Sequence, residues 1–333
     1  MKTLSALVCL FLLTAAVVAQ KLPKPKLSPS QPTAEQSKTI EQGIALHDAK
    51  KYDEAIAKYV SVLAGNPDLT SALYELTLSY YNRGDKAKAK ETAYRGAGYI
   101  SDDLPLFYGM IASCLDDEGK SDDAIKIYKE AEDILRSYPD MRRHLASIYY
   151  NLGVTYVRQK KYPESRIELK KAVEHNFGYA SPHYLLSIVF EGTKYKIPAF
   201  LAAARFISLE MNTTRTKRSA DLIVGMLTPA KDSKTGNINI FMDLDAPKDE
   251  GDFGMFDLLL GTLTTVKNEK EKKKTENENF VDAIGTIVAF LTEDKKLANT
   301  FVGKQYVPFA AELKKSGHLE AFGNIVLFVN NNA

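Results

Sequence analysis

The sequence predicts an all-α fold, a solenoid of about five helix pairs followed by an α-helical C-terminal region. Small residues recur at intervals of 34, 35, 41 and 34 positions, and this series consists of Gly43, Thr77, Ala112, Gly153 and Ser187. A second series follows twelve positions later and consists of Ala55, Ala89, Ala124, Ser165 and Ala199. A third series, four positions further on, consists of Tyr59, Ala93, Tyr128, Leu169 and Ala203. Small residues at such a fixed period mark close helix crossings in stacked helix pairs.

Each unit is expected to contain two helices joined by a short turn. In the first unit the apolar spacing predicts helices over residues 37–49 and 53–63, the second of which ends before Gly65 and Pro67. The fourth unit is a near copy, with Tyr149, Leu152, Gly153 and Tyr156 in its first helix and Ser165, Leu169 and Ala172 in its second. The 41-residue interval adds seven residues around positions 134–144. The second helix of the third unit is therefore expected to be longer, or to be followed by an excursion.

The first 19 residues are predicted to be a cleavable signal peptide. An uncharged apolar run over residues 4–19 follows Lys2 and ends in small residues, so cleavage is expected before Gln20. This run is shorter than the roughly 20 residues of a permanent membrane span. We therefore expect a secreted or periplasmic protein without an integral membrane span after signal cleavage. The alternative is a protein anchored in a membrane by an uncleaved N-terminus.

Residues 20–35 are predicted to be a Pro-rich linker. They hold four prolines and few apolar residues, which favours an extended tether that spaces the folded body from its point of origin.

The region 214–333 does not repeat and is expected to be a helical cap or a second domain. Residues 214–227 have the apolar spacing of a sixth first helix, which would cover the end of the solenoid. A short strand is predicted over residues 237–244, and a polar insert over residues 267–278. Four further helices are predicted over residues 253–266, 280–291, 301–314 and 319–329.

The charge balance argues against nucleic acid as a partner. The chain has 44 basic and 42 acidic side chains and a formal charge of +2, so no binding to nucleic acid is expected.

Cys114 is the one cysteine left after signal cleavage, which excludes an intrachain disulfide and a thiolate metal site. A buried, inert thiol is expected at this position.

Over residues 36–213 the pattern resembles the tetratricopeptide repeat. The family signature of Leu-Gly, Tyr and Ala positions is met in the fourth unit by the residues given above, and in the first unit by Gly43, Leu46, Ala55, Tyr59 and Pro67. Thr77 and Ala112 depart from it, because they replace the glycine of the second and third units. The resemblance implies that the first helix of each unit lines a concave groove that binds a protein or peptide.

The resemblance also implies which side chains face this groove, and these include Ile40, His47, Asp116 and Asp117. The ten of them that are predicted to bind the partner are Ile44, Tyr74, Leu78, Tyr81, Asn82, Tyr150, Val154, Arg158, Tyr184 and Ile188. A tyrosine-lined groove suits an extended peptide or an amphipathic helix. Ile40 and Ile44 stand where the chaperone-docking members of the family carry Lys and Asn, so clamping of a peptide carboxylate is not expected. Packing of the tyrosines inside the solenoid is an equally open interpretation, because periodicity does not separate a groove from a core.

No motif in the sequence predicts a catalytic residue, a cofactor or a metal ion. Gly119-Lys120-Ser121 resembles the end of a phosphate-binding loop, but Cys114 stands where that loop needs another glycine. Asp243, Asp245, Asp249, Glu250 and Asp252 form an acidic cluster, but Pro247 and Lys248 break the spacing of a calcium loop. The histidines His47, His144, His175, His183 and His318 form no metal-binding pattern.

These observations together predict an exported, non-enzymatic scaffold that mediates protein–protein interactions through the tyrosine-lined groove. Two alternatives remain. The first is an envelope-anchored accessory protein for assembly or secretion, which an uncleaved N-terminus would favour. The second is a hydrolase with its site in residues 230–333, which a requirement for Asp243 or His318 would favour.

Overall fold

The computed structural model describes residues 21–138, 144–227, 247–253 and 275–332, and its regular elements are helices. The first ten helices form five consecutive pairs, α1 (Ala34–Asp48) with α2 (Tyr52–Gly65), α3 (Thr70–Arg83) with α4 (Lys86–Gly96), α5 (Leu104–Asp117) with α6 (Ser121–Arg136), α7 (Leu145–Arg158) with α8 (Tyr162–His175), and α9 (Ala180–Gly192) with α10 (Lys196–Leu209). The prediction of an all-α solenoid of five helix pairs is confirmed.

The helix ends follow from local capping. Helix α1 begins three residues before the predicted start, because Thr33 and Gln36 form a capping box in which each side chain accepts from the other's backbone N–H. Helix α6 has 16 residues, against 14 in α8, so part of the longer third interval lies in this helix. The excursion predicted around Pro139 lies outside the described residues.

The turn inside each unit contains one residue in the left-handed region. Gly84 and Gly119 have φ of 96° and 77° at this place, and Lys50, Lys160 and Lys194 have φ of 60°, 59° and 68° at the same place in the other units. A side chain with a Cβ adopts this conformation at a cost, whereas glycine does not. Gly119, which belongs to the tripeptide that resembles a phosphate-binding loop, is therefore explained by the turn that it forms.

Replacing Lys160 by glycine is expected to raise the free energy of unfolding. Relief of the left-handed strain of about 1–2 kcal/mol is partly offset by the greater entropy of glycine in the unfolded chain. The net gain should be a few tenths to about 1 kcal/mol in urea unfolding. The same change at Gln159, the residue before it, serves as the control and should give no gain.

The small residues lie where paired helices approach most closely, as predicted. A Cβ placed on Gly43 would be 2.5 Å from the ring of Tyr59, and one on Gly153 would be 2.8 Å from Cγ of Leu169. The first and third series of the repeat are therefore in direct contact across each of these two pairs. This contact fixes how closely α1 packs on α2 and α7 on α8.

Gly153→Val is expected to destabilise the fold by about 1–3 kcal/mol, because the added methyl groups collide with Leu169 in a closely packed interface. Gly225→Val is the matched control, since no atom lies within 4 Å of a Cβ at that helical glycine. Thermal unfolding should show a lower midpoint for the first variant and an unchanged midpoint for the second. Equal midpoints would contradict the close crossing.

The C-terminal helices complete the core of the last repeats. Helix α11 (Thr214–Leu227) packs on α10, and α13 (Glu276–Glu293) and α15 (Leu319–Asn332) pack on α11. The short 3-10 helix η2 (Lys295–Asn299) leads into α14 (Phe301–Lys315), which contacts α8 and α10. One hydrophobic cluster contains buried residues from α8 to α15, so the described part of this region acts as a cap on the solenoid.

Four of the five C-terminal helices predicted from the sequence are present in the structure. The other elements predicted for this region lie mostly outside the described residues. Helices α11, α13, α14 and α15 correspond to the spacing in residues 214–227, 280–291, 301–314 and 319–329. The predicted strand over residues 237–244, most of the helix over 253–266 and most of the polar insert lie outside the described residues. Within the described ranges, every helix is too short or too polar to cross a membrane.

The Pro-rich segment is extended as predicted, but the structure corrects its role as a free tether. Residues 21–33, called the N-terminal segment below, pack against the first three helix pairs, and α1 begins directly after them. Leu22 is 4% exposed and belongs to the core cluster, and Pro25 is also buried. Prolines prevent helix formation, but they leave side chains and carbonyl groups free to dock.

Candidate partner-binding surface

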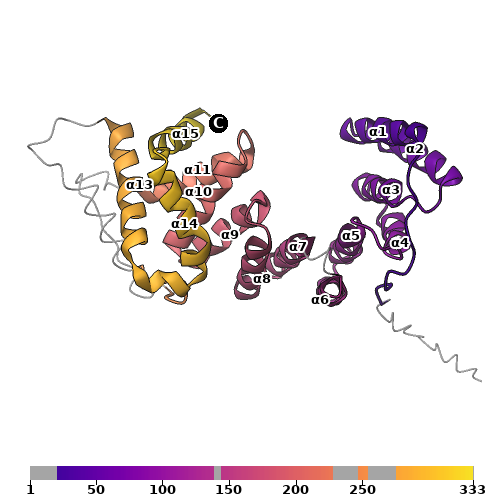
Figure 1. Cartoon of the computed structure of the whole chain (residues 1–333), viewed down its shortest axis with the longest axis horizontal. Helices are drawn as coiled ribbons and strands as arrows, with labels where there is room; N and C mark the ends of the chain where they lie inside the picture. The colour runs from indigo at the N-terminus through magenta and orange to yellow at the C-terminus, as the bar shows by residue number, and fades with distance from the viewer. Residues whose placement is uncertain (1–20, 139–143, 228–246, 254–274, 333) are drawn as a thin grey trace, which may run out of the picture.

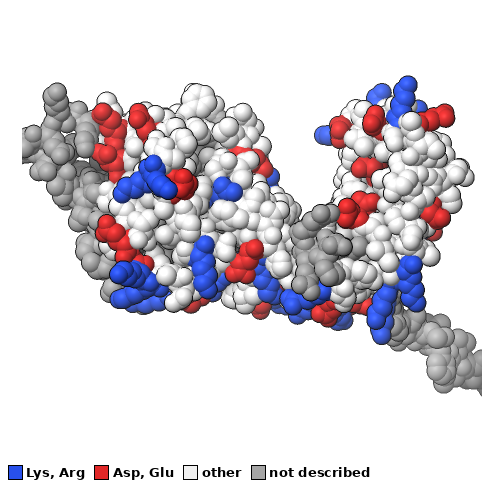
Figure 2. Space-filling view, viewed as in Figure 1, with Lys and Arg blue, Asp and Glu red and all other residues white. Residues whose placement is uncertain are grey.

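The helix pairs follow an arc, and the first helix of each pair lies on its inner side (Figure 1). Helices α1, α3, α5, α7 and α9 form this inner face, while the second helices lie outside. In the space-filling view the arc encloses a deep hollow between the N-terminal repeats and the C-terminal helices (Figure 2). The inner face is the concave surface that the sequence predicts.

The ten predicted groove residues all lie on first helices of the inner face and none is buried. Asn82 and Arg158 are exposed, and the half-buried ones are Ile44, Tyr74, Leu78, Tyr81, Tyr150, Val154, Tyr184 and Ile188. Ile40 and Asp116, in contrast, are each 7% exposed, so the structure corrects the expectation that these two side chains face the groove. Whether these residues touch a partner stays a prediction.

An apolar row runs along the inner face with one interruption. Ile44, Leu78, Val154 and Ile188 each follow directly after the small residue of their unit, and all are half-buried. Ser113 occupies this place in the third unit. The row therefore has two apolar halves that flank a polar step on α5.

The tyrosines of the inner face are partly engaged by packing within the protein. The ring of Tyr74 lies edge-on to Phe107 with centroids 6.0 Å apart, and the ring of Tyr150 lies edge-on to Tyr179 at 5.4 Å. Burial raises the pKa of Tyr74 to about 12, so its hydroxyl stays protonated. Each ring thus has a supported edge and a remaining half-exposed surface, which fits both interpretations left open by the sequence.

Tyr184 and Tyr150 have distinct structural surroundings. Tyr184 packs on Phe206 of α10 with centroids 5.1 Å apart, and the guanidinium of Arg215 lies 5.4 Å from its ring centroid. Tyr150 contacts both hydrophobic clusters of the protein, the one shared by the first repeats and the one shared with the cap. Replacing Tyr150 would therefore disturb the junction between the two clusters as well as the inner face.

A ladder of polar contacts joins neighbouring first helices near their C-terminal ends. His47 on α1 lies 2.8 Å from Oγ of Ser79 and 3.0 Å from Nδ2 of Asn82, both on α3. The hydroxyl of Tyr81 donates to Oδ2 of Asp117 on α5 at 2.5 Å. These contacts connect residues 32 to 36 positions apart, so no local sequence pattern reveals them.

The ladder continues from α5 to α7 through Arg158. Its guanidinium donates to Asp116 at 2.7 Å and to Asp117 at 2.9 Å, and Lys86 donates to Asp117 at 3.0 Å. Hydrogen bonds from Tyr81, Lys86 and Arg158 hold the pKa of Asp117 below its ordinary value against the opposing effect of burial. Three of the predicted groove residues, Tyr81, Asn82 and Arg158, are thus members of this intramolecular ladder.

Sequence reasoning missed an acidic region on the N-terminal part of the inner face. Glu75 on α3 lies near Asp103 at the start of α5 and near Asp48 at the end of α1, and burial together with these two charges raises its pKa. Burial also raises the pKa of Asp103. Figure 2 shows acidic side chains on the side of these repeats that borders the hollow. A cationic group placed there would relieve this repulsion.

The acidic cluster considered for calcium is instead neutralised by basic side chains. Asp249 pairs with Arg166 at 2.9 Å, Glu250 with Lys170 at 2.5 Å, and Lys248 with Asp252 at 2.9 Å. Asp243 and Asp245 lie outside the described residues. In the described part of the chain, no group of three or more His, Cys, Asp or Glu side chains is arranged to hold a metal ion.

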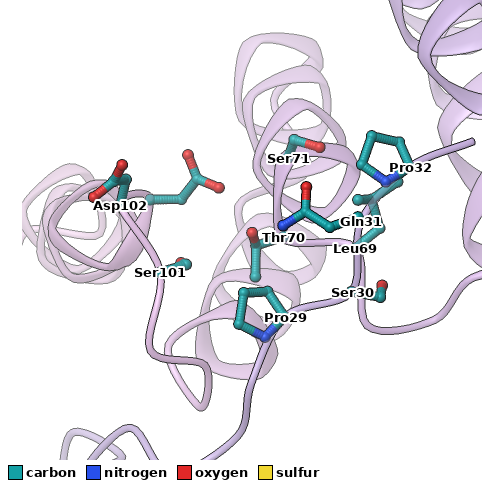
Figure 3. A pocket seen from close by; sticks show the side chains of 10 residues that line it. Pro29, Ser30, Gln31, Pro32, Leu69, Thr70, Ser71, Ser101 and Asp102 are labelled. Carbon is teal, nitrogen blue, oxygen red and sulfur yellow. The ribbon is translucent and has the colours of Figure 1, made fainter. Parts of the chain in front are cut away.

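A polar cavity of about 330 Å³ lies beside the N-terminal segment (Figure 3). Pro29, Ser30, Gln31 and Pro32 form one wall, and the starts of α3 and α5 form the others through Leu69, Thr70, Ser71, Ser101, Asp102 and Asp103. The segment thus closes one side of the cavity. The cavity lies at the edge of the first repeats and contains none of the ten predicted groove residues.

Comparison with known proteins supports the repeat assignment. Models described as tetratricopeptide repeat match residues 71–95, 106–134 and 146–176. No curated protein matches the chain. The similar solved structures include PilF of Pseudomonas aeruginosa, with 15% identity, a TM-score of 0.46, and coverage of 57% of this chain and 82% of that one.

Two further structures are similar at the same level. A thermophilic TPR protein of Thermus thermophilus has 16% identity and a TM-score of 0.47, and it covers 57% of this chain and 99% of its own. PilW, described as a widely conserved type IV pilus biogenesis factor, has 13% identity and a TM-score of 0.45, with coverage of 59% and 84%. The period of the small residues, the paired helices and the matched models agree, and the chain contains tetratricopeptide repeats over residues 71–176.

Proposed function

We propose that this protein is an exported, non-enzymatic scaffold that binds an extended peptide or an amphipathic helix of a partner protein on its inner face. The observation that carries the proposal is the row of half-buried apolar side chains along that face, Ile44, Leu78, Val154 and Ile188. Apolar side chains spaced along consecutive helices suit a ligand that runs across several repeats. Export rests on the predicted signal peptide.

The polar ladder supports this role by holding the face in one shape. Hydrogen bonds between α1 and α3, α3 and α5, and α5 and α7 limit how far neighbouring repeats rotate against each other. A surface that is already ordered loses less entropy when a ligand binds. Burial raises the pKa values of Glu75 and Asp103, so the charged form of each carboxyl group is disfavoured in this protein. We therefore expect the partner to carry basic side chains opposite the N-terminal repeats.

Paired substitutions on the two faces test the proposal. Leu78→Ser with Val154→Ser removes two apolar contacts from the inner face, and Val60→Ser with Ile167→Ser is the matched control, since Val60 and Ile167 are exposed on the outer helices α2 and α8. Each lost apolar contact should weaken partner binding about ten-fold in a titration. Equal weakening by both pairs would place the partner elsewhere.

The envelope-anchored alternative is distinguished by the N-terminus of the protein isolated from its source. Sequencing that begins at Gln20 supports export with cleavage, whereas a chain that retains residues 1–19 supports the anchor. In the anchored case the N-terminal segment would provide little spacing, because Leu22 is already packed in the core. Leu22 lies three positions after Ala19, a reach of about 10 Å at most.

Of the two residues that the hydrolase alternative names, the structure describes His318. His318 lies exposed in the turn between α14 and α15, with Nδ1 2.9 Å from Oγ of Ser316. Asp243 lies outside the described residues. The described residues therefore do not test a pairing of these two side chains, and the alternative stays a prediction.

A further inference from the structure

The N-terminal segment is bound along the edge of the first three repeats in the manner of a peptide ligand. It runs against the direction of the solenoid, from α6 past the α4–α5 turn to the α2–α3 turn (Figure 1). Along this path the Leu22 amide donates to Glu130 at 3.4 Å, the Leu27 carbonyl accepts from the Ile100 amide at 2.8 Å, and the Ser30 amide donates to the Asp68 carbonyl at 3.1 Å. The bound path therefore crosses three consecutive repeats.

Backbone groups of the segment are recognised individually. The hydroxyl of Tyr108 donates to the carbonyl of Pro23 at 2.8 Å, and the amides of Lys26 and Leu27 donate to the carbonyl of Gly98 at 2.9 and 3.0 Å. The residues 27 and 99 form a parallel bridge. Main-chain hydrogen bonds of this kind give affinity for an extended peptide of suitable shape.

Side chains of the segment add selectivity. Leu22 and Pro25 are buried, whereas Lys21, Lys24 and Lys26 are exposed. A polyproline-type helix has three residues per turn, so two residues three positions apart lie on the same face. The edge thus accepts an apolar residue followed three positions later by proline and leaves the intervening polar side chains in solvent.

We propose that this edge is a second peptide-binding site, separate from the inner face. Its ligand is an extended Leu-Pro-Xaa-Pro segment, and its occupant in this chain is the N-terminal segment, residues 21–33. The body of the site consists of Gly98, Ile100, Tyr108 and Glu130. Covalent attachment keeps the segment at an effective concentration in the millimolar range, so a competing peptide is excluded while the segment is docked. Release of the segment makes the site available to the same sequence in trans.

The proposal does not depend on partner binding at the inner face. None of the residues that hold the segment belongs to the apolar row, and the two sites can therefore be tested with separate variants. The third wall of the cavity in Figure 3 is the C-terminal part of the segment, so release would open that cavity as well.

The experiment uses the full-length chain and a fluorescent peptide of residues 21–33. Leu22→Asp places a charge in the buried position and should release the segment, and Leu27→Asp is the matched control because Leu27 is 53% exposed. The labelled peptide should bind the Leu22→Asp chain at least ten-fold more tightly than the wild-type or Leu27→Asp chain. A peptide that itself carries Leu22→Asp should bind none of them.

Hydrogen exchange provides the second readout, because the Ile100 amide is protected by the Leu27 carbonyl only while the segment is docked. Exchange at Ile100 should be faster in the Leu22→Asp chain and should slow again when the wild-type peptide is added. Pro25→Ser loosens the same contact without a buried charge, and it serves if the first variant loses its helical circular dichroism. Unchanged exchange in a folded variant, or equal peptide binding by all three chains, would overturn the proposal.

Discussion

Ending the chain after Thr228 is expected to unfold the last repeats. The cap places Phe280, Ile284, Tyr306 and Val326 in the same hydrophobic cluster as α8, α9 and α10, and each is at most 7% exposed. Burial of each such side chain contributes about 1.5–3 kcal/mol to the free energy of unfolding. The loss of all four is therefore comparable to the total stability of a domain. Circular dichroism should show reduced helix beyond the residues removed, and gel filtration should show aggregation.

A shorter truncation after Lys315 is the graded control. It removes α15 alone, and with it the buried residues Phe322 and Val326, so a folded protein with a lower unfolding midpoint is expected. If the chain ending at Thr228 keeps the wild-type midpoint, the cap is an independent domain. The expected instability also means that partner binding is better mapped with point variants than by removing the C-terminal region.

Acidification is expected to destabilise the protein through His183. The imidazole is fully buried, with Nδ1 2.9 Å from the hydroxyl of Tyr306 on α14 and Nε2 3.1 Å from the carbonyl of Phe177. Burial lowers the pKa of His183 from 6.5 to about 4. Between these values the unfolded chain binds a proton that the folded chain does not, so stability is present above pH 6.5 and is lost as the pH falls to 4.

The size of the loss follows from the pKa difference and is about 3 kcal/mol at full protonation. Urea unfolding at a series of pH values measures it, with His183→Gln as the comparison. That variant should be less stable at pH 7, because it loses the fit to Tyr306, but its stability should fall less steeply between pH 6.5 and 4. The raised pKa of Glu75 increases the stability of the folded state as the pH falls, which is opposite to the effect of His183. This contribution is the same in the wild type and in the variant, so it cancels in the comparison. Equal slopes would contradict a buried neutral histidine.

The repeat was predictable from sequence because its determinants are local or periodic. Gly43 and Gly153 meet the side chains that the third series places against them, and the left-handed turn falls at the same place in every unit. The inner face of each first helix was expected from the resemblance to the tetratricopeptide repeat, which places Leu78 and Val154 on that face. The ladder was not, because Tyr81 and Arg158 find their partners on other repeats.

The N-terminal segment shows a different limit of sequence reasoning. Its prolines correctly exclude a helix, but composition alone does not distinguish a free linker from an extended segment that is bound. The spacing of three between Leu22 and Pro25 was the available signal, and it has meaning only once a surface complementary to that spacing exists. The helices of the cap were likewise predictable from their apolar spacing. The core that the cap shares with the last repeats was not, because it depends on contacts such as that of His183 with Tyr306, 123 residues apart.

Position-specific photo-cross-linking tests directly whether the inner face binds the partner. A photoreactive side chain is introduced at Leu78 or Val154 on the inner face, and at Val60 or Ile167 on the outer helices, and each chain is exposed to the extracellular and envelope fractions of its source. We expect that one partner protein is cross-linked from both inner positions and from neither outer position. Cross-linking of that partner from the outer positions, with none from the inner ones, would contradict this expectation.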